Sequence, residues 1–320
     1  MAIAVQTNVS SINTTRRLNA ANHKLDTSYQ RLSSGMRINS AKDDAAGLQI
    51  SNRMTSQING YTQGNRNAND GIALAQTAEG ALDEVTSMLQ RIRTLAVQSA
   101  NGSNTSADRK SIQAEVNALS NEITRIACQT SFGGQKILNG FGGKNNILDG
   151  NGNGDGKTLS FQVGANNEAG DRITLSLSQS FTVKALATAA GITAASDEKG
   201  NKDGLKTDAT ALAEGGKDNV GFSVSKQENA QGAIEAVDKI LAVVDSKRGE
   251  MGAVQNRLQS TISNQESVIE NQSDARSRIR DTDYATEAAA LSQQNIIQQA
   301  ATSMLTQANS RPQLALSLLG

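Results

Sequence analysis

The 320-residue sequence contains one proline, no tryptophan and only 2% aromatic residues. The proline is Pro312, so no obligatory helix breaker occurs before that position. With 37% hydrophobic residues and so few aromatic rings, the composition favours thin helical bundles over a thick globular core. We therefore expect a mainly α, elongated chain.

A net charge is also missing, because 31 lysine and arginine residues balance 31 aspartate and glutamate residues. Nucleic-acid binding needs positive charge for the phosphates or aromatic platforms for the bases, and this chain offers neither. No segment approaches the roughly 18 apolar residues of a membrane-spanning helix, and the N-terminus lacks a basic segment followed by a hydrophobic run. The sequence therefore predicts no nucleic-acid partner, no membrane insertion and no cleavable signal peptide.

Cysteine and histidine occur once each, as Cys128 and His23. A single cysteine allows no internal disulfide, and a single histidine allows no histidine metal cluster. Cys128 has no histidine nearby to activate its thiol, and His23 has only Asp26 close by in the sequence. We interpret Cys128 as a buried or semi-buried small residue and His23 as a helix-surface residue, and we expect no catalytic residue and no cofactor.

Two acidic clusters allow a functional interpretation, but in both a structural interpretation is preferred. Asp43 and Asp44 are adjacent, and neighbouring helix residues point about 100° apart, which favours a helix N-terminal charge or a subunit salt bridge over acid–base catalysis. The second cluster has the spacing of the first half of a calcium loop, but Ser160 stands where a bidentate glutamate is needed. A glycine-rich turn is therefore preferred to a metal site with the candidate ligands Asp149, Asn151, Asn153 and Asp155.

The C-terminal segment has apolar residues at helical spacing, which predicts a helix over residues 283–310. Asp281 or Thr282 is the expected cap, and Pro312 is the expected stop. The face of this helix is poor in large side chains, so the helix cannot bury enough area alone to stay ordered in water. It needs a partner.

The segment 1–40 predicts a second amphipathic helix of similar length at the other end of the chain. Ser33-Ser34-Gly35 can interrupt or end it, and Asn39-Ser40 offers the cap of the next helix. The two terminal helices are therefore candidates to pair with each other.

The segments between the ends change their period along the chain. Apolar residues spaced four and three apart over 78–96 and 112–126 predict two helices that fold back on each other. Alternation of apolar and polar residues over 159–177 predicts a β-hairpin. Helical spacing returns from residue 229 in a coiled-coil-like helix of about 45 residues.

Three long segments carry a resemblance: RLSSGMRINSAKDDAAGLQIS at 31–51, LQRIRTLAVQSANG at 89–102 and SDARSRIRDTDYATE at 273–287. They are similar to bacterial flagellin, and the resemblance covers about residues 1–140 and 229–320. It implies a non-enzymatic subunit that polymerises into the flagellar filament, the helical propeller of swimming cells. It also implies type III export to the extracellular flagellum, with an export chaperone, the filament cap and hook-junction proteins as partners.

The predicted fold is a mainly α, coiled-coil-like helical rod built from both chain ends, with a β-hairpin region and a small α/β or irregular outer insertion. Residues 1–44 and 277–320 are expected to form a terminal helical core domain. Residues 45–180 and 222–276 are expected to form a helical rod domain with the β-hairpin, and 181–221 a variable insertion.

The two alternatives are a related flagellar protein and an enzyme from another class of protein. A hook–filament junction or cap-like protein would share the heptad-rich ends. An enzyme carried in the central insertion is disfavoured, because that region contains neither histidine nor cysteine.

The weak terminal helices and the resemblance together predict a polymerisation surface. Helices that are too poor in bulk to stay folded alone gain burial among neighbouring subunits, so ordering of the ends is coupled to assembly. The residues assigned to it are Val5, Val9, Ile12, Leu18, Leu25, Leu32, Ile297, Met304, Leu316, Leu318 and Leu319.

The resemblance also implies recognition by a host Toll-like receptor. The family's contact residues correspond here to Arg91, Leu95, Gln98 and Glu115. The first three are spaced four and three apart, so we expect them on one helix face.

Overall fold

The computed structural model describes residues 7–140, 147, 158–177, 179–192, 205–207 and 220–317. The chain folds into two compact units, Met1–Asn59 with Ser267–Gly320, and Gly60–Glu266. The first unit therefore combines the two ends of the chain.

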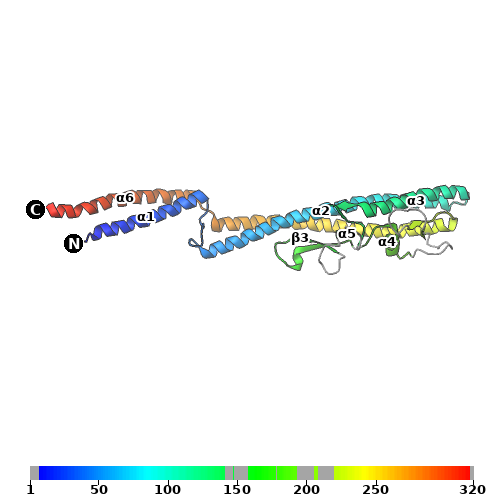
Figure 1. The fold of residues 1–320 in the computed structure, drawn as a ribbon, viewed down its shortest axis with the longest axis horizontal. Helices are drawn as coiled ribbons and strands as arrows, with labels where there is room; N and C mark the ends of the chain where they lie inside the picture. The colour runs from blue at the N-terminus through cyan, green and yellow to red at the C-terminus, as the bar shows by residue number, and fades with distance from the viewer. Residues whose placement is uncertain are drawn as a thin grey trace. The chain divides into compact units, whose positions relative to one another are not determined.

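Helices account for most of the described residues (Figure 1), which confirms the mainly α prediction. The helices are α1 Val9–Ser34, α2 Ala45–Ala100, α3 Ser106–Gln129, α4 Val183–Ala189, α5 Gln227–Arg280 and α6 Tyr284–Ser317. The strands are β1 Ser131–Phe132, β2 Gln135–Lys136, β3 Thr158–Gln162, β4 Arg172–Ser176, β5 Leu205–Thr207 and β6 Val220–Phe222. They pair antiparallel as β1 with β2, β3 with β4, and β5 with β6.

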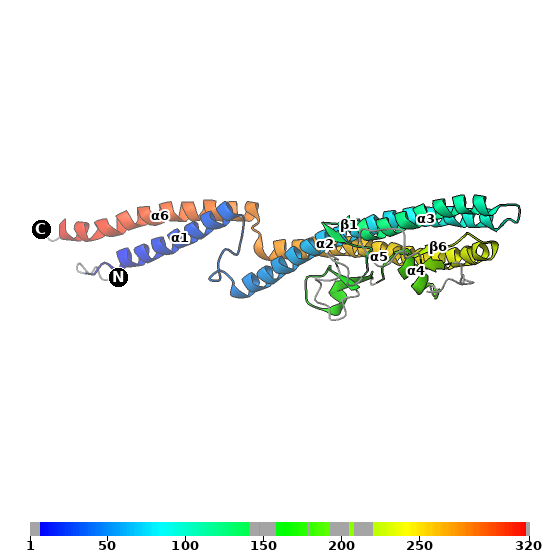
Figure 2. The same ribbon diagram turned by 45° about the vertical axis from the view of Figure 1, so that its right-hand side comes forward.

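In the unit Gly60–Glu266, α2, α3 and α5 run side by side in both ribbon views (Figures 1 and 2). The apolar stripes of the predicted heptads lie between them, which confirms the helical periods inferred from the sequence. The residues that are fully buried, at 0% exposure, include Ala78, Leu82, Val85, Ile92, Ala96, Val116, Ile123, Val237, Val244, Met251 and Leu258. This unit has a hydrophobic core of its own.

The turn between α2 and α3 is closed by a capping box. The Thr105 hydroxyl oxygen accepts from the Asp108 backbone N–H at 3.3 Å, and the Asp108 carboxylate accepts from the Thr105 backbone N–H at 2.9 Å. The Thr105 hydroxyl also donates to that carboxylate, and this bond chiefly holds the pKa of Asp108 below its ordinary value. Thr105 is therefore the N-cap of α3.

The predicted β-hairpin is confirmed as β3 and β4, in which Leu159 faces Leu175 and Phe161 faces Ile173. A shorter hairpin, β1 with β2, was not predicted. Its turn is Gly133-Gly134, and both glycines have positive φ, at 56° and 82°. Two consecutive left-handed residues suit a tight hairpin and are accessible to glycine without strain.

Helix α5 is longer than predicted, at 54 residues. The apolar stripe ends near Ile269, but the helix continues to Arg280. The polar residues beyond the stripe are helix formers, and Arg278 pairs with Asp274 one turn away at 2.8 Å. Periodicity alone could not reveal this extension, because it reports only the buried face.

In the unit of the chain ends, α1 and α6 lie side by side and antiparallel in both views (Figures 1 and 2). The predicted end of α1 is confirmed, since Gly35 closes the helix in the left-handed conformation at φ 69°. The cap predicted at Asn39-Ser40 is wrong. Helix α2 begins at Ala45, and the Asp44 carboxylate accepts from the Gly47 backbone N–H at 2.9 Å.

Both predicted boundaries of the C-terminal helix are also wrong. The cap is Asp283, whose carboxylate accepts from the Ala285 backbone N–H at 2.9 Å, instead of Asp281 or Thr282. The hydroxyl of Thr286 donates to the same carboxylate and is the main cause that lowers the pKa of Asp283. At the other end, α6 continues past Pro312 to Ser317.

Candidate functional site

The contact between α1 and α6 is made mainly by small side chains. Ala21, Leu25 and Ser28 of α1 are buried, as are Ala301 and Ala308 of α6. A seam of alanine and serine removes little apolar surface from water, because each methyl group contributes only about 0.8 kcal/mol. The pair is therefore weakly held by its own hydrophobic contact.

Large apolar side chains on the same two helices remain exposed. Val9 and Ile12 of α1 are 68% and 62% exposed, and Ile296, Ile297 and Met304 of α6 are 66%, 40% and 60% exposed. Ile296 was missed by sequence reasoning, because it does not belong to the stripe of Ile297 and Met304. We call these five residues the terminal apolar surface.

The residues predicted to act in polymerisation fall into three groups. Val9, Ile12, Ile297 and Met304 are exposed on the terminal apolar surface. Leu25 is buried in the seam, and Leu18 and Leu32 are half-buried beside it. The remaining candidates, Val5, Leu318, Leu319 and the side chain of Leu316, lie outside the described residues.

A groove of about 600 Å³ runs along one side of the seam. Ala20 and Ala21 of α1 line it together with Ile297, Ala301 and Met304 of α6. The cationic side chains of Arg17 and Lys24 also contribute to its wall. The polar residues Ser10, Asn13, Thr14 and Gln294 complete the lining, so the groove combines an apolar part with polar side chains and positive charge from α1.

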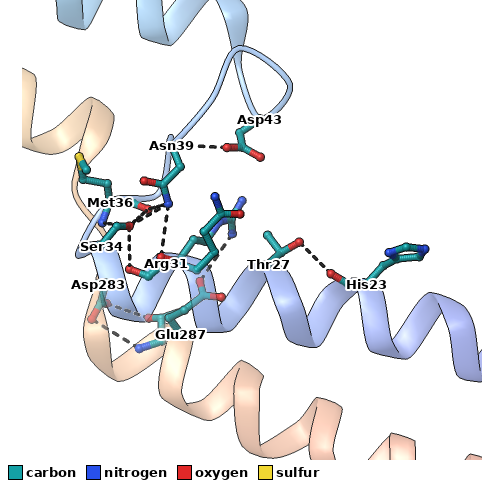
Figure 3. A network of polar contacts seen from close by, with 11 residues as sticks. His23, Thr27, Arg31, Ser34, Met36, Asn39, Asp43, Asp283 and Glu287 are labelled. Carbon is teal, nitrogen blue, oxygen red and sulfur yellow. Dashed lines mark hydrogen bonds and ion pairs between the residues drawn. The ribbon is translucent and has the colours of Figure 1, made fainter.

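Polar contacts tie α1 to α6 along their length. Near the middle, Gln298 Nε2 donates to Asn22 Oδ1 at 2.9 Å. Near the C-terminal end of α1, Arg31 and Glu287 form an ion pair at 3.5 Å, and Figure 3 shows the two side chains pointing toward each other. These contacts define one register for the pair, which the small side chains of the seam cannot do.

The two connections that leave the helix pair are also bonded to each other. The backbone N–H of Thr282 donates to the Gly35 carbonyl at 3.0 Å, and that of Arg37 donates to the Arg280 carbonyl at 2.7 Å. The Arg37 guanidinium reaches the carbonyl of Ile279 at 2.7 Å and so occupies the C-terminal end of α5. The α1–α2 and α5–α6 connections thus form one joint.

Asn39 and Asp43 hold the α1–α2 connection in shape (Figure 3). Asn39 Nδ2 donates to Ser34 Oγ at 2.8 Å, and the Asp43 carboxylate accepts from the backbone N–H of Asn39 at 3.1 Å and of Ser40 at 3.0 Å. These backbone donors, that of Ser40 first, hold the pKa of Asp43 below its ordinary value. Asp43 and Asp44 therefore each bind backbone N–H groups separately and do not converge on a reacting atom.

The residues predicted to contact a receptor are only partly on the surface. Arg91 of α2 and Glu115 of α3 form an exposed ion pair at 2.6 Å, and Gln98 is exposed as well. Leu95 is 2% exposed and belongs to the core, so the prediction that it shares a surface face with them is wrong. Because α2 packs against other helices on two sides, its apolar stripe is wide enough to include Leu95.

The remaining candidates have structural surroundings. His23 is exposed, and its backbone carbonyl accepts from the Thr27 hydroxyl at 2.8 Å. Cys128 is half-buried, with its Sγ 3.6 Å from Asn139 Oδ1. Within the described ranges, no three His, Cys, Asp or Glu residues lie close enough to hold a metal ion. The possible calcium ligands Asp149, Asn151, Asn153 and Asp155 lie outside those ranges.

Comparison with known proteins identifies the family. Residues 5–142 match the family "Bacterial flagellin N-terminal helical region", and residues 234–319 match the family "Bacterial flagellin C-terminal helical region". The chain is 42% identical to Flagellin B of Vibrio cholerae and 40% identical to Polar flagellin F of Vibrio parahaemolyticus, with 100% of both chains covered in each case. The chain belongs to the bacterial flagellin family.

As a flagellin, the chain is a structural subunit of the flagellar filament and not an enzyme. Relatives that match over their whole length are flagellins, which favours the filament subunit over a hook-junction or cap-like protein. A crystal structure of Bacillus cereus flagellin is 24% identical, covers 62% of this chain and 88% of its own, and has a TM-score of 0.44. None of the helices in the described part of this flagellin is sufficiently long and apolar to span a membrane.

Proposed function

We propose that the terminal helices of this flagellin become ordered by packing against neighbouring copies in the filament. The observation that carries the proposal is the terminal apolar surface, which is exposed on two helices whose own seam is built from small side chains. Fixing the backbone of one residue costs roughly 1–2 kcal/mol, which a seam of methyl groups at about 0.8 kcal/mol each does not offset. Burial against other subunits supplies the missing free energy.

In this proposal residues 1–44 and 277–320 form the terminal domain, which becomes ordered on assembly. Residues 45–180 and 222–276 form the domain that is folded before assembly. Residues 181–221 form an outer insertion. The groove beside Ile297 and Met304 receives apolar side chains of a neighbouring copy. Such a contact joins two different surfaces and does not close on itself, so repetition gives an open helical filament.

Weak terminal helices also suit export. A chain whose ends are unfolded before assembly can pass through the flagellar type III apparatus, with an export chaperone covering the ends, and then be added beneath the filament cap. Hook-junction proteins would meet the same surfaces at the base of the filament. The extracellular flagellum is then the place where the ends first become ordered.

The assembly proposal is tested by replacing exposed apolar residues. The double variant Ile297→Ser with Met304→Ser should raise the critical concentration for salt-induced polymerisation more than tenfold, because each site loses roughly 1 kcal/mol or more of burial between subunits. Gln293→Ser is the matched control, since Gln293 is exposed on the same helix and polar. Sedimentation and electron microscopy measure the result, and an unchanged critical concentration in the double variant contradicts the proposal.

Deletion of residues 281–320 gives a coarser test. The truncated chain should remain a soluble monomer with a folded central unit, because the core of Gly60–Glu266 contains none of the deleted residues. Normal filaments from the truncated chain would contradict the proposal that the chain ends are required for assembly.

As a second function, we propose that the face around the Arg91–Glu115 ion pair is recognised by a host Toll-like receptor. The pair is 56% and 46% exposed and bridges α2 to α3, and Gln98 lies further along α2. Arg91→Ala should lower receptor signalling by purified monomer about tenfold or more, since hot-spot arginines contribute about 2 kcal/mol or more. Arg125→Ala is the control, because Arg125 forms a similarly exposed ion pair with Glu122 on α3. Equal signalling by both variants removes this assignment.

A further inference from the structure

The last turns of α6 contain a gap in their backbone hydrogen bonding. In an α-helix the carbonyl of residue i accepts from the N–H of residue i+4. For Ala308 this donor would come from residue 312, which is proline and has no N–H. Ala308 is only 6% exposed, so its carbonyl oxygen needs another donor.

Asn8, at the opposite end of the chain, supplies that donor. Its Nδ2 donates to the Ala308 carbonyl oxygen at 2.7 Å, and its Oδ1 accepts from the Ser11 backbone N–H at 3.0 Å. One side chain therefore caps the start of α1 and also completes the hydrogen bonding of α6. The Ser11 hydroxyl adds a bond to Asn309 Oδ1 at 2.7 Å.

We propose that Asn8 is the positioning residue that fixes the register of α1 against α6 at the far ends of the two helices, which the Gln298–Asn22 and Arg31–Glu287 contacts do not reach. It does so by replacing the backbone donor that Pro312 lacks. The seam itself specifies the register weakly, because apart from Leu25 its buried side chains are alanine and serine. Pro312 is the single proline of the sequence, so Ala308 is the one carbonyl whose helical donor a proline removes. Only one alignment of the helices brings Asn8 to it.

This inference rests on the proposed ordering of the ends during assembly, and it adds the residue that aligns the far ends of the two helices. It also accounts for the hydrogen bond that α6 loses at Pro312. The Ala308 carbonyl is bonded only when the N-terminal segment lies in this register.

A double-mutant cycle in the full-length chain tests the proposal. Asn8→Ser keeps an oxygen for the helix cap but removes the Nδ2 donor, and Pro312→Ala restores the backbone N–H of residue 312. Asn8→Ser should raise the critical concentration about fivefold when Pro312 is present, which corresponds to the loss of one hydrogen bond. In the Pro312→Ala background the same substitution should change it by less than about twofold.

The control is Asn19→Ser on the same helix. Asn19 is exposed and makes no hydrogen bond through its side chain within the described part of the chain, so the substitution should leave the critical concentration unchanged. As a second readout, amide exchange in assembled filaments should be faster over residues 305–317 in Asn8→Ser than in the parent chain, and Pro312→Ala should remove the difference.

Two results would overturn the inference. An equal rise in both backgrounds would mean that Asn8 acts through something other than the Ala308 carbonyl, and no rise in either would mean that the contact does not set the register. The assembly proposal fails separately. If the Ile297→Ser, Met304→Ser chain polymerises normally while the Asn8 and Pro312 substitutions remain coupled, the terminal apolar surface is not the assembly surface but the register residue stands.

Discussion

Two methionines of this flagellin show how its two units differ. Met251 of α5 is 0% exposed within the unit Gly60–Glu266, whereas Met304 of α6 is 60% exposed within the unit of the chain ends. Both lie on long helices with apolar residues at helical spacing. The same pattern therefore encodes a core that the chain completes alone in one unit, and a surface that the chain leaves exposed in the other.

The largest effect expected from this comparison comes from truncating the two methionines separately. Met251→Ala should destabilise the monomer by about 2–5 kcal/mol, because it leaves a cavity in a packed core. Met304→Ala should change the unfolding of the monomer by less than about 0.5 kcal/mol, since its side chain is already in water. Thermal or urea unfolding of the monomer measures both, and similar losses at the two sites would mean that the units do not differ as described.

Under conditions in which the central unit of both variants is folded, only Met304→Ala should weaken assembly. This second measurement, by sedimentation, separates a defect in folding from a defect in contact between subunits. A Met304→Ala chain that assembles as the parent does would restrict the contact to the other exposed residues.

Two glycines of α2 give a smaller and more local test within the central unit. Gly64 is buried, and a Cβ added there would collide with the carbonyl oxygen of Val163, the residue that follows β3. Gly64→Ala should therefore destabilise the monomer by about 1–3 kcal/mol. Gly80 is exposed, with nothing within 4 Å of an added Cβ. Gly80→Ala should therefore stabilise the helix by up to about 1 kcal/mol.

Differential scanning calorimetry of the two glycine variants measures whether each substitution raises or lowers the stability of the monomer. The substitutions are chemically identical and lie on the same helix, so helix propensity cancels between them. A gain in stability at both positions would show that β3 does not pack against α2 as closely as the contact at Gly64 indicates.

The smallest effect concerns pH and the two capping carboxylates. Asp108 and Asp283 both have pKa values below the ordinary 3.8, so each stabilises its helix above that pH and the contribution is lost as the pH falls through the folded value. Asp108→Asn should lower the Tm of the monomer by about a degree at about pH 6, and the difference should shrink as the pH falls below 3.8. Asp283→Asn should leave the monomer unchanged and affect only filaments.

The contrast between these caps sharpens the comparison of the units. A pH-dependent loss in the Asp283→Asn monomer would mean that α6 is already ordered before assembly. Circular dichroism of both variants across the same pH range measures the difference.

The helices of the central unit could largely be predicted from the sequence, because an apolar spacing of four and three places those residues on one face of an α-helix. Ala78, Leu82, Val85 and Ile92 were assigned to a heptad and are all fully buried. Glycine pairs were less informative, since Gly133-Gly134 marks a hairpin only when short strands flank it. Leu95 was misplaced because spacing fixes the angle of a residue around a helix but not how many sides of that helix are covered.

The terminal unit was predictable in its pairing and in the end of α1 at Gly35, but the boundaries of α6 were not. Helix caps depend on which of several adjacent acceptors reaches a free N–H, so Asp283 could not be chosen over Asp281 from the sequence. Where α6 passes through Pro312, the Ala308 carbonyl is bonded by a distant donor, Asn8, which lies 300 positions away in the sequence. Local rules treat proline as a stop because they cannot include such a donor.

The joint between the two helix connections has a mechanical consequence. Gly35 and Arg37 on one connection are hydrogen-bonded to Thr282 and Arg280 on the other. A torque that reaches either connecting segment is therefore transmitted to both, and neither segment can rotate independently of the other. In a filament that turns to propel a cell, this hydrogen-bonded joint would make each subunit resist twisting at the two connecting segments.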